Sequence, residues 1–196
     1  DHSNHPLNVQ RIYRSFGNFL NGMGEKWSHG FSGSIDTSSI DDGTIVINLS
    51  NSGKNIITRS SSGAWISATN DNLIETADEW IYDQSIDDTR WRFGKNGLLL
   101  SITGRDGLSY SMGYGQTERL VSVTNAFGRK LQYIYTSEGL LGSIVLPSGQ
   151  GIVSYAYDNG RLVTVTAPDG STMRYTYEDE RWPSALTGLI DSDNRR

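Results

Sequence analysis

The chain of 196 residues contains no cysteine, so disulfide bonds and thiolate-based metal or redox sites are excluded. Its longest uninterrupted aliphatic run, Leu98–Leu100, is far too short for a membrane span or the apolar core of a secretory signal. Basic residues are not in excess, since 17 basic and 22 acidic residues give a net charge of −5, which argues against a nucleic-acid binder. We therefore expect no nucleic-acid partner and no membrane span, and we expect any export signal to lie outside these residues.

The sequence also has little that predicts α-helix. No long stretch keeps an uninterrupted i, i+3, i+4 apolar pattern between good caps, and the only weak candidates are Phe16–Leu20 and Asn72–Trp80. Turn-forming Gly, Ser, Asn and Asp are abundant instead, and Val, Ile, Thr and aromatic residues fill the short segments between them. This composition predicts an all-β chain built from hairpins.

The second half of the chain repeats every 21 residues. Each unit has an anchor leucine, then a branched aliphatic residue three positions later and a glycine eight positions later. A fifth unit begins at Leu186 after a longer loop at 180–183, with Leu189 and Asn194 in the matching positions. The anchor leucines are Leu99, Leu120, Leu141 and Leu162, the branched residues are Ile102, Val123, Ile144 and Val165, and the glycines are Gly107, Gly128, Gly149 and Gly170.

Each unit has the pattern of a β-hairpin. In the fourth unit we predict a strand at 162–166, a tight turn at 168–170 and a returning strand at 172–177. Asp169 and Gly170 suit the turn, because glycine adopts the positive φ that other residues resist. Alternate strand residues share a face, so stacked hairpins would align tyrosine rings on one side of a sheet. The paired tyrosines are Tyr133 with Tyr135, Tyr155 with Tyr157, and Tyr175 with Tyr177.

These units resemble the YD repeat of the Rhs (rearrangement hotspot) proteins, whose pattern is roughly G-R-L-x-x-V-T-x-P-D-G-x-x-x-x-Y-x-Y-D. Residues 160–178 follow it almost throughout, residues 118–136 and 139–158 follow it well, and the first unit diverges most. In the first half, the segment GEKWSHGF, which contains Trp27, Ser28 and His29, is similar to the signature that opens the Rhs core. More distantly, the repeats are similar to those of insecticidal toxin complexes and animal teneurins.

The resemblance implies a domain organisation and a function. It implies a flexible leader at 1–6, a core-opening β region with the Trp-Ser-His segment and hairpins at 7–94, and about four and a half YD repeats at 95–196. In Rhs proteins the repeats form a β-cocoon, a shell that encloses a C-terminal toxin delivered to competing cells. We therefore expect a non-catalytic strip of such a shell without cofactors, secreted or at the cell surface of a bacterium. Its expected partners are the rest of the shell, the toxin cargo and secretion-system components.

Five hairpins are too few to close around a folded toxin, so we expect the chain to be a fragment or a truncated family member. An isolated strip leaves unpaired edge strands, which tend to pair with other chains. Self-association through these edges is therefore expected.

Two other functions are alternatives to the shell. For a hydrolase, the adjacent Ser28 and His29 would point to opposite faces of a strand, and the aspartates that precede turn glycines suit turn chemistry. His2 and His5 fall in the leader, where disorder is expected, so no metal cluster is predicted. For a surface adhesin or carbohydrate-binding module, the tyrosine rings would stack on sugars. The orientation of the tyrosines, towards a packed layer or an open groove, separates this alternative from the shell.

Overall fold

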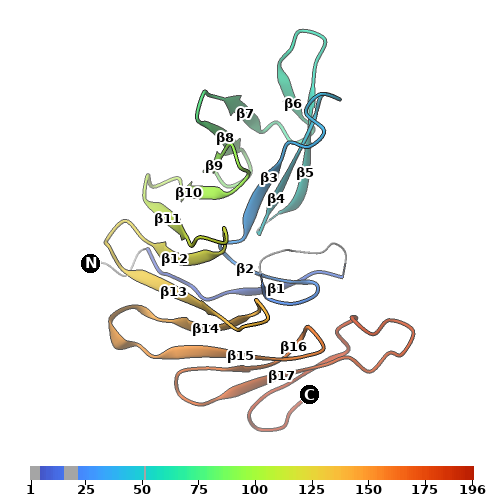
Figure 1. Ribbon diagram of the computed structural model, residues 1–196, viewed down its shortest axis with the longest axis vertical. Helices are drawn as coiled ribbons and strands as arrows, with labels where there is room; N and C mark the ends of the chain where they lie inside the picture. Colours follow the sequence, from blue (N-terminus) through green and yellow to red (C-terminus); the bar gives the residue numbers. More distant parts are fainter. Residues whose placement is uncertain (1–4, 16–21, 51) are drawn as a thin grey trace. The chain divides into compact units, whose positions relative to one another are not determined.

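The computed structural model describes residues 5–15, 22–50 and 52–196, which form β-strands, turns and loops (Figure 1). Within these residues the sole helical segment is a three-residue 3-10 turn at Pro147–Gly149. The prediction of an all-β chain is therefore confirmed. The prediction of a weak helix at 72–80 is wrong, because this segment forms two strands with a turn between them. The other weak helix candidate, 16–20, lies outside the described residues.

The strands form three sheets. A two-stranded sheet pairs β1 (Arg11–Tyr13) with β2 (Trp27–His29), and a four-stranded sheet runs β3 (Gly33–Asp36), β4 (Thr44–Leu49), β5 (Gly53–Arg59) and β6 (Trp65–Ser67). The third sheet has twelve strands hydrogen-bonded in chain order. They are β7 (Asn72–Glu75), β8 (Glu79–Gln84), β9 (Thr89–Gly94), β10 (Leu99–Thr103), β11 (Ser109–Tyr114), β12 (Leu120–Thr124), β13 (Lys130–Tyr135), β14 (Leu141–Val145), β15 (Ile152–Asp158), β16 (Arg161–Thr166), β17 (Thr172–Thr176) and β18 (Gly188–Ile190).

The chain divides into two compact units that do not follow chain order. One unit contains Asp1–Pro6, Phe31–Glu118 and Val123–Gly128. The other contains Leu7–Gly30, Arg119–Ser122 and Arg129–Arg196. Each unit thus combines repeat strands with a segment from the first half of the chain. The domain boundaries drawn from the sequence, at 7–94 and 95–196, stay a prediction.

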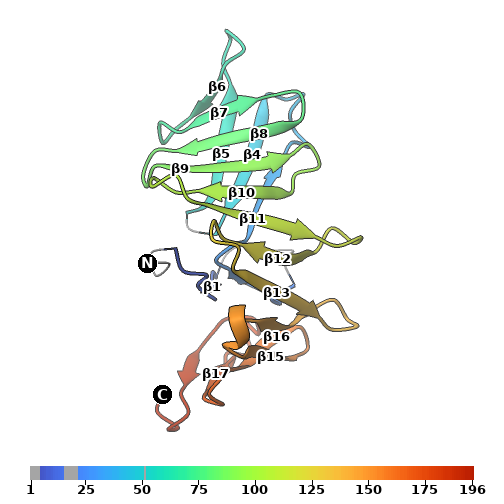
Figure 2. The same ribbon diagram turned by 90° about the vertical axis from the view of Figure 1, so that its left-hand side faces the viewer.

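In the first unit the four-stranded sheet packs against β8 to β10, which pass in front of β4 and β5 in Figure 2. The alternation of apolar and polar residues in β4 turns three aliphatic side chains inward, where they are buried. On the opposing sheet, β8 and β9 form one of the hairpins expected in the core-opening region, with Tyr82 opposite Trp91. The two layers approach closely at Gly33, where an added Cβ would lie 3.1 Å from Leu99 Cδ2.

In the second unit, β1 and β2 lie on one face of the repeat strands. The Trp27 ring lies 4.5 Å from the Tyr175 ring between centroids, and the His29 ring lies 5.1 Å from the Tyr133 ring. Main-chain hydrogen bonds add to these contacts, because Leu141 donates its N–H to the carbonyl of Gly22 at 2.7 Å. A segment far away in sequence therefore covers the repeats.

The last residues of the predicted flexible leader, His5 and Pro6, are held by contacts with the repeats. Residues 1–4 lie outside the described part, but His5 is buried and stacks on Tyr110 with ring centroids 3.9 Å apart. The Asn125 side chain donates to the His5 carbonyl at 2.8 Å, and the Tyr110 hydroxyl donates to the Pro6 carbonyl at 2.8 Å. The prediction that His5 is disordered is wrong, because these stacking and hydrogen-bonding partners come from the repeats.

Candidate functional site: the tyrosine-lined face of the repeats

In the first, third and fourth repeats, the first strand contains a β-bulge directly after the anchor leucine. In the fourth repeat Tyr157 pairs with Leu162 and Ala156 with Thr164, so Val163 is an extra residue. The same shift leaves an extra residue after Leu99 and after Leu141. On a regular strand, residues three apart point to opposite faces, whereas one inserted residue restores them to the same face. The bulge therefore buries both the leucine and the branched residue that follows it by three positions.

The turn glycines adopt the backbone predicted for them. Gly107, Gly128, Gly149 and Gly170 have φ values of 77°, 75°, 73° and 84°. In the fourth repeat Asp169 Oδ1 accepts a hydrogen bond from the Ser171 N–H at 2.9 Å, and it also accepts one from the Ser171 hydroxyl. The Ser171 hydrogen bonds hold the pKa of Asp169 below its usual value. This carboxylate is therefore engaged in closing the turn.

The second tyrosine of each repeat is bound to the main chain of its own repeat, and in the first repeat, where Met112 takes the place of the first tyrosine, this residue is Tyr114. Its hydroxyl donates to the carbonyl oxygen of the anchor leucine, beside the bulge. Because a bulge disrupts the hydrogen-bonding ladder locally, the phenol gives this main-chain acceptor a partner. The bonds join Tyr114 to Leu99 at 2.8 Å, Tyr135 to Leu120 at 3.0 Å, Tyr157 to Leu141 at 2.9 Å and Tyr177 to Leu162 at 2.8 Å.

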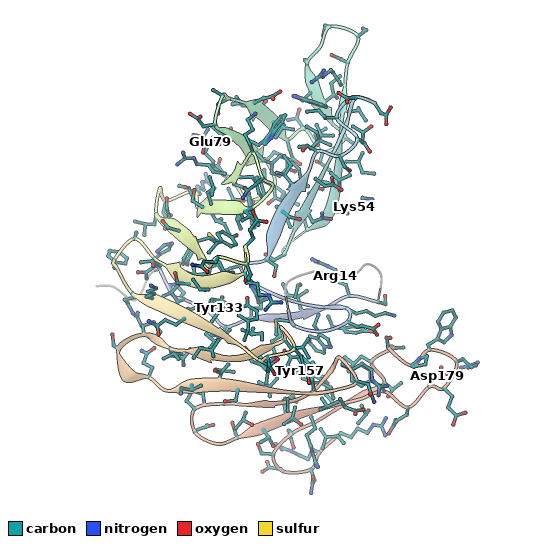
Figure 3. The ribbon with its side chains drawn as sticks, viewed as in Figure 1. Arg14, Lys54, Glu79, Tyr133, Tyr157 and Asp179 are labelled. Carbon is teal, nitrogen blue, oxygen red and sulfur yellow. The ribbon has the colours of Figure 1, made fainter. Side chains whose placement is uncertain are left out.

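The first tyrosines form the buried centre of this face. Tyr133, Tyr155 and Tyr175 are 5 to 7% exposed. Burial raises the pKa of Tyr155 to about 12, although the nearby positive charge of Arg11 opposes the shift. Figure 3 labels one first tyrosine, Tyr133, and one second tyrosine, Tyr157, which come from different repeats. The rings thus belong to a packed layer, which is the arrangement expected of a structural wall.

Trp27 connects the core-opening segment to the fourth repeat. Its ring is buried against Tyr175, and its Nε1–H donates to the Tyr177 hydroxyl at 2.9 Å. That hydroxyl donates onward to the Leu162 carbonyl, so a chain of hydrogen bonds runs from the indole to the bulge. Beside it, Arg11 Nε donates to the Tyr175 hydroxyl at 3.0 Å. Neither Trp27 nor Arg11 was assigned these partners from the sequence.

Ser28 and His29 complete the motif singled out in the sequence. Both are buried, and β1 places Ile12 opposite Ser28 and Arg11 opposite His29. As neighbours on one strand they point to opposite faces. Burial lowers the pKa of His29 from 6.5 to about 4, so its imidazole is neutral at pH 7. Both faces of β2 are therefore buried, and the motif has a packing role.

The low pKa of His29 makes stability depend on pH. The unfolded chain binds a proton at this residue below pH 6.5 and the folded chain does not until about pH 4, so stability is full above pH 6.5 and falls between these values. We expect urea titrations to show a loss of about 2 kcal/mol from pH 7 to pH 5. A His29→Phe variant should lack this loss, and an unchanged pH dependence in the variant would refute the assignment.

The phenol bonds can be tested by a matched pair of substitutions on β13. Tyr135→Phe removes the donor to the Leu120 carbonyl and should lower the free energy of unfolding by about 1 kcal/mol. Tyr133→Phe is the control, because within the described residues its hydroxyl makes no such bond to a main-chain carbonyl. Equal losses in the two variants, measured by guanidinium denaturation, would show that the phenol bond contributes nothing.

One comparison with known proteins identifies part of the chain. Residues 95–130 match the family model described as RHS Repeat. This segment is therefore similar to an Rhs repeat. The matched segment includes β10 to β12, and the match supports the resemblance to the Rhs/YD-repeat family. No curated protein matches the chain. The Rhs repeat is a structural repeat, found in extracellular or cell-surface proteins.

Two further features are absent from the described residues. None of their helices has the length and apolar character needed to cross a membrane. The same residues contain no group of three or more histidine and acidic side chains placed to hold a metal ion.

Proposed function

We propose that this chain is a non-catalytic section of an Rhs-type shell that encloses a C-terminal toxin and helps to deliver it to competing cells. The observation that carries the proposal is the bonding of the second tyrosine to the anchor-leucine carbonyl in four successive repeats. Side chains used in this way stiffen a wall, because their hydroxyls are bound to the main chain. The enclosure of a toxin comes from the family resemblance, and the repeat geometry supports it by providing a rigid, extendable sheet.

A carbohydrate-binding module is the second candidate, and one residue favours it. Sugar stacking needs an open ring face, but Tyr175 lies against Trp27 and the Tyr177 hydroxyl is engaged with Trp27 and Leu162. Trp182 differs, because it is 66% exposed. Binding to a glycan array that is lost in Trp182→Ala would establish this function.

The shell proposal is tested by limited proteolysis of the product of the complete gene. The C-terminal segment should resist protease in the intact protein and become sensitive after mild denaturation. Trp27→Ala, which opens the packed face, should expose it under native conditions, whereas Trp182→Ala should not. Cleavage of the C-terminal segment at the same rate in the intact protein as in isolation would overturn the proposal.

A further inference from the structure

Arg11 brings a positive charge to the tyrosine face of the repeats. It lies on β1 directly opposite His29 of β2, so the two side chains share the face of this strand pair that packs on the repeats. Arg11 Nε donates to the Tyr175 hydroxyl at 3.0 Å, and the Arg11 charge also acts on the Tyr155 phenol. None of the ion pairs formed by the described residues involves Arg11. The guanidinium therefore lies against phenols without a carboxylate to balance its charge.

The first tyrosines of the third and fourth repeats have hydroxyl protons that need an acceptor. The Tyr155 hydroxyl is buried, and within the part of the chain that the structure describes it donates to no acceptor. The Tyr175 hydroxyl accepts from Arg11, and among the same residues it donates no bond of its own. The second tyrosines differ, because each donates to a leucine carbonyl, as Tyr177 does to Leu162. Since an unused buried donor costs free energy, an acceptor is needed beside Tyr155 and Tyr175.

The first compact unit shows how this chain satisfies a buried phenol with a carboxylate of its own. The Tyr82 hydroxyl donates to Asp71, whose other carboxylate oxygen accepts from the Ser85 N–H at 2.8 Å. In the second unit no acidic side chain among the described residues acts on Tyr155 in this way. A partly buried cation without a counter-charge is costly, so a negatively charged acceptor satisfies this cluster better than a water molecule does.

We propose that Arg11, Tyr155 and Tyr175 form a binding site for a small monovalent anion such as chloride. The anion would accept hydrogen bonds from both phenols and from the remaining N–H groups of the guanidinium. Both phenols are buried, so a large anion would not reach them. One guanidinium balances one negative charge, which favours a monovalent ion over a divalent one.

A bound anion would join β1 to two repeats. Arg11 belongs to β1, whereas Tyr155 belongs to the third repeat and Tyr175 to the fourth. Chloride would thus stabilise the packing of β1 on the tyrosine face, and its removal would loosen this contact. The site depends only on donors and charges of the second compact unit, so the proposal stands or falls separately from the toxin shell.

The test is thermal unfolding of the 196-residue chain in sodium chloride and in sodium gluconate at equal ionic strength. Gluconate is too large for the site, so the difference in unfolding temperature between the two salts reports chloride binding. With a dissociation constant of about 10 mM, about 100 mM chloride would raise the folded-to-unfolded ratio about tenfold. We expect this to appear as an unfolding temperature about 3–5 °C higher in chloride.

Two variants remove the donors, and each has a matched control. Tyr155→Phe deletes a hydroxyl and keeps the ring, so it should reduce the chloride shift by about half or more, whereas Tyr135→Phe, whose hydroxyl is bound to the Leu120 carbonyl, should keep the full shift. Arg11→Gln should abolish the shift, whereas Arg181→Gln, which changes an exposed guanidinium of the same unit, should keep it. Each comparison is between two salts for one variant, so a general loss of stability in a variant does not affect the result.

Chloride binding is measured independently of stability by the broadening of the ³⁵Cl NMR line. The wild-type chain should broaden the line more than Tyr155→Phe and Arg11→Gln do. Equal unfolding temperatures of the wild type in the two salts, or an undiminished shift in either variant, would overturn the proposal, the latter by showing a general effect of salt on the protein surface. Equal broadening by the wild type and both variants would overturn it as well.

Discussion

Replacing Trp27 with alanine is expected to lower the free energy of unfolding by about 3–5 kcal/mol. The indole is buried against the Tyr175 ring and lies 5.3 Å from the Tyr13 ring. Truncation would leave a cavity in this layer and remove the donor to the Tyr177 hydroxyl. Guanidinium denaturation followed by circular dichroism measures the loss.

Trp182→Ala provides the control for this experiment. Trp182 is an exposed tryptophan in the same compact unit, so its removal should change the free energy of unfolding by no more than about 0.5 kcal/mol. If the two tryptophan variants lost the same stability, Trp27 would not be the connection between the opening segment and the repeats.

Replacing Gly24 with alanine should cost about 3 kcal/mol or more, from two sources. Gly24 has a φ of 81°, which L-residues resist, and an added Cβ would lie 2.4 Å from the carbonyl oxygen of Gly160. The clash is with main chain, and the Glu25 N–H donates to that same carbonyl at 3.2 Å. The segment would therefore have to move away from the repeat turn to relieve the overlap. Thermal and chemical unfolding of the variant measure the cost.

Gly170→Ala separates the cost of the left-handed backbone from the cost of the clash. Gly170 has a similar φ of 84°, but an added Cβ would meet nothing within 4 Å. This variant should lose only about 1–2 kcal/mol, the cost of a left-handed backbone for alanine. A Gly24→Ala variant no less stable than Gly170→Ala would contradict the close packing of the opening segment on the turn.

The local features of the repeats were predictable from the sequence, because they depend on residues near one another in the chain. Positive φ at Gly107 and Gly170 follows from turn chemistry, and the alternation of Tyr175 with polar neighbours follows from strand geometry. The bulge was not predicted, although its signal was present. Leu162 and Val165 are three apart, a spacing that a regular strand cannot bury on one face.

Contacts between distant segments could not be predicted in this way. The constant separation between each anchor leucine and the second tyrosine hinted at a shared role, but the hydroxyl–carbonyl bond depends on where the bulge turns the main chain. The contacts of Trp27 with Tyr175 and Tyr177, and the stacking of His5 on Tyr110, join residues more than 100 positions apart. Periodicity shows which side of a strand is buried, and it does not show what covers that side.

The central feature of the repeats is that the second tyrosines are bound to the main chain inside a closed face. Specific ¹³C labelling of tyrosine Cζ, with deuterium isotope shifts recorded by NMR, measures the exchange of each hydroxyl proton. We expect slow exchange for the hydroxyls of Tyr135, Tyr157 and Tyr177, and rapid exchange of the Tyr177 hydroxyl once Trp27→Ala opens the face. Solvent-rate exchange of all three hydroxyls in the wild-type protein would contradict it.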